Sequence, residues 1–437
     1  MAIDVSSAFF FSPFSPISTP SIPCLIRSVK RLPFPPSPWS CSSSSFRFSS
    51  NYAAPGSSSN RSSYSRRWIN PLSNGTSQEV VRQWIEADTS ISSQDKFTVA
   101  SYNILGDRNA SKHRDLYSNI PSSYINWGRR KRVICEELME WDPDIICLQE
   151  VDRYFDLSED LRRGGYAGSY KKRTGDSADG CAIFWKSNKF RVLQAESIEF
   201  KSIGLRDNVA QLSIFEMCKG KSQRLIVGNI HVLYNPSRGE VKLGQIRTLS
   251  SRAHILANEW GNIPVLVAGD FNATPPSAIY KYLSTSELDI LLHDRRELSG
   301  QRSCHPAQVF GLNGNSMSSC ITIERSLNSG WSEEEIRTVG ANAGVVTHRL
   351  KLNSSYATIN GSATRDPRGE PLATSYHSKF FGTVDYIWYT DGLEPTRVLD
   401  TPSVDVLRRT GGLPCKNVGS DHLALVAEFA FTNHAES

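Results

Sequence analysis

Seven polar groups stand where apolar, strand-like runs of this sequence begin or end. They are Asn103, Glu150, His231, Asp270, Asn272, Asp385 and the pair Asp421–His422. A carboxylate at the end of a buried strand costs free energy unless it is paired, hydrogen-bonded or holding a cation. A single Asp or Asn in such a place usually forms a turn. Because seven such groups occur at the ends of six runs, the sequence predicts that they converge on one pocket.

The residue types in this set indicate which chemistry such a pocket would perform. Carboxylates without cysteine partners suit a hard, oxygen-preferring cation, so Mg²⁺ is expected, with Mn²⁺ as the alternative, rather than zinc. Such an ion neutralises a phosphoryl group and activates water. Asn and His side chains add hydrogen-bond donors where negative charge develops in the transition state. The set therefore predicts hydrolysis of a phosphate ester.

Short runs rich in Val, Ile and Phe would position these groups. They cover residues 97–105, 144–151, 180–187, 208–217, 224–233, 264–271, 385–390 and 422–431. Several are apolar on both faces, which is typical of buried strands. Ile134, Leu138 and Trp141 recur at helical spacing, and a second stripe runs from Ile246 to Trp260, so a helix is expected at each. This pattern predicts a four-layered α/β sandwich, in which helices flank two packed mixed sheets.

Composition divides the chain into two parts. Residues 1–90 are rich in Ser and Pro at the start and predict a disordered leader. The catalytic domain is expected over 95–432, with a surface insertion at 311–344, where Ser332 and Glu335 predict a capping box. The leader's composition is typical of an organellar transit peptide, and an ordinary disordered leader is the alternative.

The formal net charge of +5 is concentrated in the leader. Residues 1–77 contain seven basic residues and one acid, which leaves the remainder at −1, so net charge gives no argument for nucleic-acid binding. Nine cysteines occur, never as C-x-x-C, and they predict reduced thiols of an intracellular protein rather than a disulfide framework or a zinc site. No apolar run approaches the roughly 18 residues of a membrane helix.

The motifs SYNIL, LQE, HVLYNP, GDFN, DYI and SDHLAL, in this order, resemble the endonuclease/exonuclease/phosphatase superfamily. Within it, RDNVAQL, NIHVLYNPSRGEVKLGQI and GDFNATPPSAIY resemble the carbon-catabolite-repressor-type deadenylases. The similarity extends over residues 95–431. It implies a magnesium-dependent 3′–5′ exoribonuclease that shortens poly(A) tails of mRNA and releases 5′-AMP. The alternative is a phosphatase or phosphodiesterase of the same fold that acts on a dinucleotide or another small phosphate ester.

The resemblance also implies which residues hold the metal. Glu150 is the implied principal ligand, and Asn103 would bind near it and orient the scissile phosphate. Asp270 is implied either as the general base or as a ligand of a second metal. Asp421 would help to hold metal.

The remaining catalytic roles follow from the same resemblance. His422, oriented by Asp385, would contact the scissile phosphate. His231 would donate to a non-bridging oxygen, and Asn272 would lie beside the general base and the substrate.

A proline and a phenylalanine sandwich the adenine in the deadenylases, and the matching residues here are Pro236 and Phe380. From the residues alone, Phe380 also fits a core aromatic and Pro236 also fits a turn. Arg206, like Arg238 and Lys242, lies near the motifs and is expected to contact RNA phosphates. The basic cluster 171–173 is typical of a solvated loop.

The expected partner is RNA, bound at a poly(A) 3′ end, and no membrane contact is expected. Yeast and animal deadenylases of this type carry leucine-rich repeats that dock a partner subunit, and this chain shows no such repeat. A deadenylase complex would therefore form by another route. The family implies a nuclear or cytoplasmic location, and the leader suggests a plastid or mitochondrion as the alternative. A catalytically inactive RNA-binding scaffold is a third hypothesis, but its signature, loss of a metal-binding carboxylate or of the SDH histidine, is absent.

Overall fold

The computed structural model of the chain describes residues 80–88, 95–220, 222–311, 330–361 and 363–432. The chain divides into two units, residues 1–70 and 71–437, and all described residues belong to the second. Most of the predicted leader therefore lies outside the described residues. Its predicted end at residue 90 is too late, because Trp84–Glu86 forms strand β1 and pairs with β16 (Leu393–Leu399). A strand of three residues is too short to show an alternation in the sequence.

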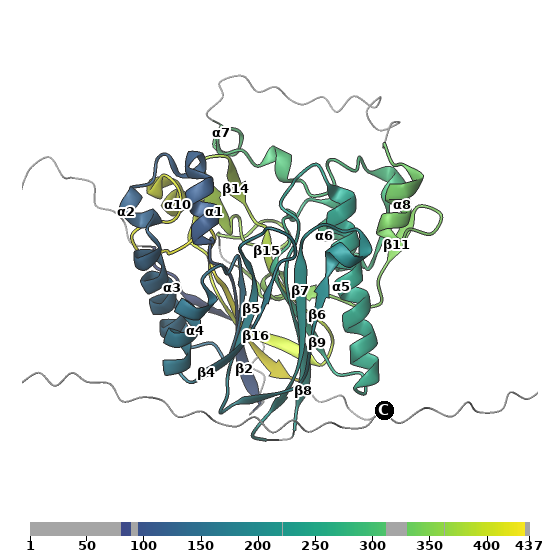
Figure 1. Cartoon of the computed structure of the whole chain (residues 1–437), viewed down its shortest axis with the longest axis horizontal. Coiled ribbons are helices and arrows are strands. Elements are labelled where there is room, and N and C mark those ends of the chain that lie inside the picture. Colours follow the sequence, from purple (N-terminus) through teal and green to yellow (C-terminus); the bar gives the residue numbers. More distant parts are fainter. Residues whose placement is uncertain (1–79, 89–94, 221, 312–329, 362, 433–437) are drawn as a thin grey trace, which may run out of the picture. The chain divides into compact units, whose positions relative to one another are not determined.

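Two mixed sheets form the centre of the domain (Figure 1). The first has the order β1-β16-β17-β2-β3-β5-β4, and the second has the order β12-β15-β9-β8-β7-β6. Each sheet contains one parallel pair, β2 with β3 and β8 with β9. The remaining bounds in the first sheet are Lys96–Asn103 (β2), Ile145–Gln149 (β3), Tyr166–Lys172 (β4), Gly180–Lys186 (β5) and Leu425–Phe431 (β17).

The second sheet contains the other long strands that were expected. Its bounds are Phe190–Glu199 (β6), Val209–Met217 (β7), Arg224–His231 (β8), Val265–Asp270 (β9), Asn353–Ser354 (β12) and Asp385–Tyr389 (β15). Two small antiparallel sheets of two strands each pair Glu287–Asp289 (β10) with Val345–Thr347 (β11), and Ser375–His377 (β13) with Phe380–Gly382 (β14).

Helices cover the outer face of each sheet, so the predicted four-layered sandwich is confirmed. Helices α3 (Trp127–Trp141) and α4 (Tyr154–Arg163) pack on the first sheet, and α5 (Gly239–Glu259) and α6 (Ala278–Thr285) pack on the second. Figure 1 shows the two helix layers on opposite sides of the sheets. The inner layer is apolar and includes residues of both sheets, among them Val99 and Leu266. Burial of this surface is the main contribution to folding.

The remaining helices are short. They are α1 (Asp107–Lys112), η1 (Arg114–Tyr117), α2 (Ser122–Ile125), η2 (Phe200–Ile203), η3 (Ile290–Leu292), η4 (Gln301–Ser303), α7 (Pro306–Val309), α8 (Glu333–Val339), α9 (Ser355–Thr358) and α10 (Val404–Thr410). The predicted capping box of Ser332 and Glu335 opens α8 and is confirmed. Residues 312–329 of the predicted insertion lie outside the described residues. Val339 of α8 is buried in the same core cluster as α5, so this part of the segment packs into the domain.

The six cysteines in the part of the chain that the structure describes are free. Within the same residues, no helix combines the length and apolar composition that a bilayer crossing requires.

Candidate active site

Three polar side chains are aligned across neighbouring strands of the second sheet. His231 of β8 pairs in register with Asp270 of β9, which pairs with Asp385 of β15. The strands approach closely beside this row, because a Cβ on Gly269 would lie 1.9 Å from the carbonyl oxygen of Ile230. Gly269 also has φ 151°, a conformation that side chains rarely adopt. Glycine before Asp270 therefore permits the approach that aligns the row.

The first sheet supplies Asn103 and Glu150 from its parallel pair. Asn103 ends β2 in register with Gln149 of β3, and Glu150 follows directly. Glu150 has φ 56°, in the left-handed region that residues other than glycine seldom adopt. Such strain in a native structure is often associated with a functional role.

The amide of Asn103 links carboxylates from the two sheets. Its Nδ2 donates to Glu150 Oε1 at 3.2 Å and to Asp270 Oδ2 at 3.1 Å. Its Oδ1 accepts from the backbone N–H of Leu105 at 3.1 Å, which fixes the orientation of the amide. Glu150 Oε2 accepts from Asn109 Nδ2 at 2.8 Å and from a backbone N–H. The structure thus brings together Glu150 and Asp270, which are 120 positions apart.

His422 and Asp385 form a buried pair beside Asp270. His422 Nδ1 lies 2.9 Å from Asp385 Oδ2, and Thr374 Oγ1 donates to the same oxygen at 2.6 Å. His422 Nε2 lies 3.9 Å from Asp270 Oδ2. Burial by itself would lower the pKa of His422, but Asp385, Asp421 and Asp270 raise that pKa well above its ordinary value. These three carboxylates therefore favour the charged form of the ring.

The pKa values of Asp270 and His231 are shifted in opposite directions. Burial, and then repulsion from Asp385, raise the pKa of Asp270 to about 7. Burial, and then the Arg173 cation, lower the pKa of His231 to about 3, so its imidazole is neutral. His231 Nε2 lies 3.5 Å from Asp270 Oδ2. A carboxyl that titrates near neutral pH is suited to accept a proton during catalysis.

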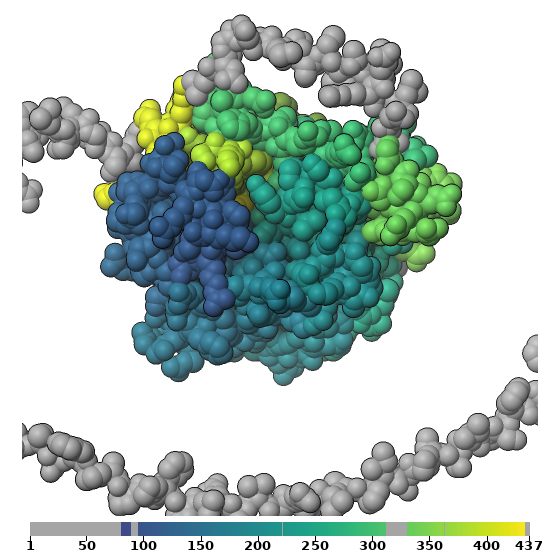
Figure 2. All heavy atoms as spheres, turned by 45° about the horizontal axis from the view of Figure 1, so that its top comes forward, coloured from purple at the N-terminus to yellow at the C-terminus, as the bar shows by residue number. Residues whose placement is uncertain are grey.

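These groups surround a cavity of about 370 Å³. Figure 2 shows a hollow between the blue helices that follow β2 and the teal, green and yellow segments later in the chain. The lining contains Leu105, Asn109, His113, Asp115, Leu116, Tyr117, Glu150, Arg173, His231, Tyr234, Asp270, Asn272, Gln301, Ser375, His377, Lys379, Phe380, Val384, Asp421 and His422. Asn103 and Asp385 lie directly behind this lining through their bonds to Asp270 and His422.

The donor set fits a hard divalent cation. Glu150, Asp270 and Asp421 lie on one cavity, and among the described residues no Lys or Arg forms an ion pair with any of them. Carboxylates grouped without a basic partner favour a bound cation. Asp421 Oδ2 accepts from the hydroxyl of Tyr117 at 2.8 Å. Burial, Asp421 and Glu150 together raise the pKa of that hydroxyl well above its ordinary value.

A second grouping lies beside these three carboxylates. Ligand atoms of Asp270, Asp385 and His422 lie within 4.8 Å of one another. Because the charged ring of His422 is already paired with Asp385, this trio is suited to hydrogen bonding rather than to holding a cation. The metal-ligand roles of Glu150, Asp421 and Asp270 stay predictions, because the group whose ligand atoms converge among the described residues is Asp270, Asp385 and His422.

Two predicted substrate contacts lie outside the lining of this cavity. Arg206 is exposed on a turn with φ 72°. Pro236 is half-buried, and its carbonyl oxygen accepts from Ser299 Oγ. Phe380 does line the cavity and is buried. The roles of all three stay predictions. Lys242, for which an RNA-phosphate contact was expected, is instead fully buried.

Several residues that the pattern of strand ends did not single out also line the cavity. Arg173 is one of them, and it pairs with Asp179 through Nε at 3.0 Å and Nη2 at 2.5 Å. The expectation of a solvated loop is therefore wrong for Arg173. Asn109, Tyr117 and Gln301 come from short helices and turns, where no periodic signal exists to find them.

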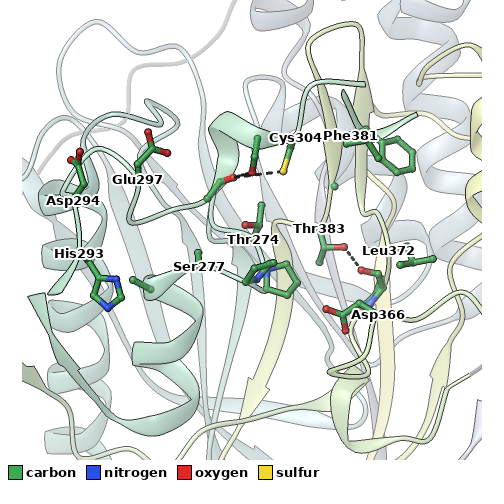
Figure 3. A pocket seen from close by; sticks show the side chains of 18 residues that line it. Thr274, Ser277, His293, Asp294, Glu297, Cys304, Asp366, Leu372, Phe381 and Thr383 are labelled. Carbon is green, nitrogen blue, oxygen red and sulfur yellow. Dashed lines mark hydrogen bonds between the residues drawn. The ribbon is translucent and has the colours of Figure 1, made fainter. Parts of the chain in front are cut away.

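A second cavity, of about 500 Å³, also has residues of β14 in its lining. Figure 3 shows Thr274, Cys304 and Phe381 among the side chains that line it. Phe380 faces the first cavity while Phe381 faces the second, as alternation along β14 requires. Strand β14 therefore contributes to the lining of both cavities.

Fold and site together define a hydrolase built on two packed mixed sheets. The model of the endonuclease/exonuclease/phosphatase family matches residues 100–422, and the chain belongs to this family. Carbon catabolite repressor protein 4 homolog 3 of Arabidopsis thaliana is 57% identical over 389 residues, which cover 86% of each chain. Homolog 5 from the same plant is 50% identical over 82% of each chain.

Solved structures also match. The crystal structure of ANGEL2, a 2′,3′-cyclic phosphatase, in complex with adenosine-2′,3′-vanadate is 30% identical, with a TM-score of 0.66. It covers 81% of this chain and 99% of that one. The predicted family is thus confirmed, and the chain is related to both the carbon catabolite repressor protein 4 homologues and the angel proteins.

Proposed function

We propose that the protein is a divalent-metal-dependent 3′–5′ exoribonuclease that shortens poly(A) and releases 5′-AMP. One observation carries the proposal: Asn103 links Glu150 and Asp270 beside the His422–Asp385 pair, around one cavity. Ligands for a cation, a proton acceptor and a cationic donor are the groups that phosphodiester hydrolysis needs. The carbon catabolite repressor protein 4 homologues support the choice of RNA.

Glu150 would hold the cation together with Asp421. When bound, Mg²⁺ or Mn²⁺ supplies charge neutralisation to the phosphoryl group. Both oxygens of Glu150 already accept hydrogen bonds from fixed amides, so its carboxylate is oriented before a ligand arrives. Such preorganisation reduces the cost of binding.

The chain's own groups move the proton and stabilise the charge. Asp270 accepts a proton from the attacking water at Oδ2, the oxygen that Asn103, His231 and His422 surround. His422 donates from Nε2 to a phosphoryl oxygen, while Asp385 holds the ring at Nδ1 and stabilises its positive charge. The neutral ring of His231 donates from Nε2 to another oxygen.

The size and lining of the cavity suit one terminal nucleotide. A volume of about 370 Å³ lies near the lower limit of small-ligand sites, roughly 300–1,000 Å³. Phe380 and the half-exposed ring of Tyr234 line it, and bases stack on such rings. Lys379 and Arg173 on the same lining supply positive charge for phosphates.

The test uses a 5′-labelled oligo(A) 20-mer with a 3′-hydroxyl, beside a 20-mer of mixed sequence, with and without Mg²⁺. The expected result is a ladder of products one nucleotide apart from oligo(A), with 5′-AMP released only in Mg²⁺. Internal cleavage, or shortening of both RNAs at equal rates, would contradict the proposed direction or the poly(A) preference.

A second candidate is removal of a 2′,3′-cyclic phosphate from an RNA end. It is favoured by the similarity to the solved 2′,3′-cyclic phosphatase. The same 20-mer bearing a 2′,3′-cyclic phosphate distinguishes the two. Under this candidate, the terminal phosphate is lost and the RNA keeps its 20 nucleotides.

A further inference from the structure

The amine of Lys242 lies in the interior of the domain, behind β9, where burial lowers its pKa to about 7. Its side chain is fully buried, and in the described part of the chain no carboxylate forms an ion pair with its amine. Lys242 also lies in the first turn of α5, where the helix dipole disfavours a cation. Each of these features costs free energy. A lysine in this place therefore needs an explanation that packing alone does not give.

The hydrogen bonds of Lys242 lead to Asp270. Its Nζ donates to the carbonyl oxygen of Asn272 at 2.8 Å and to Oε1 of Gln301. Gln301 Nε2 donates to Asn272 Oδ1 at 2.8 Å. The backbone N–H of Asn272 donates to Asp270 Oδ1 at 2.9 Å. One continuous chain of bonds thus joins a buried amine to a carboxylate of the site.

These hydrogen bonds fix the conformation of Asn272. It has φ 48°, in the left-handed region, and its Nδ2 donates to the carbonyl oxygen of Val232 at 3.0 Å. Lys242 holds its carbonyl, and Gln301 holds its side chain. With Asp270 Oδ1 occupied by the amide, Oδ2 is the oxygen directed to Asn103, His231 and His422. The strained turn therefore fixes the orientation of the Asp270 carboxylate in the cavity.

We propose that Lys242 and Gln301 are positioning residues that act as one unit on the hydrolytic step, by fixing the Asn272 turn and through it Asp270. The inference rests on phosphate-ester hydrolysis at this site, as in the proposed function, and not on a preference for poly(A). Both side chains act through Asn272, which they bind directly. Their removal therefore lowers kcat and leaves substrate binding nearly unchanged.

Ser303, on the same turn, provides a matched control for the substitutions of Gln301. Gln301 lines the catalytic cavity, whereas Ser303, two residues later in η4, lines the second cavity shown in Figure 3. Ser303 is exposed, and its hydroxyl donates to the carbonyl oxygen of Gly300. Ser303→Ala therefore changes the same turn without touching the chain of bonds. The exposed lysine of α6, Lys281, gives a similar control as Lys281→Met.

The test compares Lys242→Met, Gln301→Met and the double variant on the phosphate ester that the wild type hydrolyses. We expect kcat to fall about 10- to 100-fold in each, the range found for supporting groups of catalytic sites, with KM within about threefold. The double variant should be no slower than Lys242→Met alone, because the two residues act through one turn. Ser303→Ala and Lys281→Met should retain wild-type kcat. Unchanged kcat in the folded variants, or an effect on KM alone, would overturn the proposal.

Two further measurements keep the result decisive. If Lys242→Met does not fold, Gln301→Glu replaces it, because it keeps an acceptor for Lys242 but loses the donor to Asn272, and kcat should still fall. Hydrogen exchange of the Asn272 amide does not depend on activity and should speed up at least tenfold in Gln301→Met. An unchanged exchange rate would refute the positioning role, whereas an inactive wild type would refute the proposed function.

Discussion

His422 Nδ1 lies 2.9 Å from Asp385 Oδ2, and the two residues come from different sheets. Asp385 opens β15 in the second sheet, whereas His422 precedes β17 in the first. Asn103 makes a second such link when it donates to Glu150 and Asp270. The site is therefore assembled across the interface between the sheets, and it exists only when both sheets are packed.

Asp385→Asn should lower kcat about 1,000-fold, because the neutral amide no longer stabilises the charged ring of His422 or fixes its orientation. The melting temperature should change by only a few degrees. Steady-state kinetics and thermal unfolding check both. Thr374→Val keeps the carboxylate and removes one donor to it, so a loss of only about tenfold is expected. Near-normal turnover of a folded Asp385→Asn protein would show that the pair has no catalytic role.

Asn103→Ala should destabilise the metal-free protein more than the metal-bound protein. The substitution removes the donor shared by Glu150 and Asp270, and buried acceptors left without a partner cost about 1–3 kcal/mol each. A bound cation would satisfy the same oxygens. Thermal unfolding in EDTA and in Mg²⁺ should therefore show a larger loss in EDTA. In the control Asn109→Ala, which loses a bond to Glu150 alone, the difference should be smaller, and equal losses in both buffers would argue against a cation at these carboxylates.

Phe380→Leu should raise KM for oligo(A) about tenfold, since stacking on an aromatic ring contributes about 1–3 kcal/mol per base. The neighbouring Phe381 is the matched control, because it packs in a core cluster and faces the second cavity. Phe381→Leu should lower the melting temperature with KM unchanged. Kinetics on both variants test this contrast. A normal KM for Phe380→Leu would remove this ring from the substrate site.

Glu370 should make the domain less stable as pH rises from 4.5 to 7. Burial raises the pKa of its carboxyl from 4.5 to about 7, and its Oε1 accepts from the hydroxyl of Tyr280 at 2.8 Å. The folded state therefore binds the proton more tightly than the unfolded state does. The stabilising contribution is fully present below pH 4.5 and is lost as pH rises through 7.

The size of this effect can be measured with Glu370→Gln. A shift of this size corresponds to about 3 kcal/mol, and the neutral variant should lack that pH-dependent part. Denaturant unfolding at pH 5 and at pH 8 compares the variant with the wild type. If the wild type and Glu370→Gln lose the same stability between these pH values, the carboxyl is not protonated in the folded state.

Strand ends carried most of the information that the sequence held about the site. Asn103, Glu150, Asp270 and His422 follow or precede runs whose apolar character is visible locally, and the carboxylates and donors at their ends had few structural explanations. The packing of these runs into two sheets was predictable for the same reason. Pairing across sheets, such as that of His422 with Asp385, was supplied by the family resemblance.

The other residues of the site, and strand β1, are determined by tertiary packing and have no local sequence pattern. Tyr117 and Gln301 lie on short helices of three or four residues, which have no periodicity to detect. Lys242 looked like a cation for RNA because a lysine near a motif is usually exposed, and only the structure shows it fully buried. β1 was missed because an edge strand of three residues has no pattern of its own.

The central prediction is that carboxylates from both sheets meet around a divalent cation. The most direct measurement is the anomalous difference density of a crystal soaked in Mn²⁺. We predict a strong peak in the cavity within about 2.2 Å of a Glu150 carboxylate oxygen, a distance typical of small divalent ions, and its loss in Glu150→Gln. An active enzyme whose crystals show Mn²⁺ elsewhere, or no Mn²⁺ in this cavity, would contradict the account.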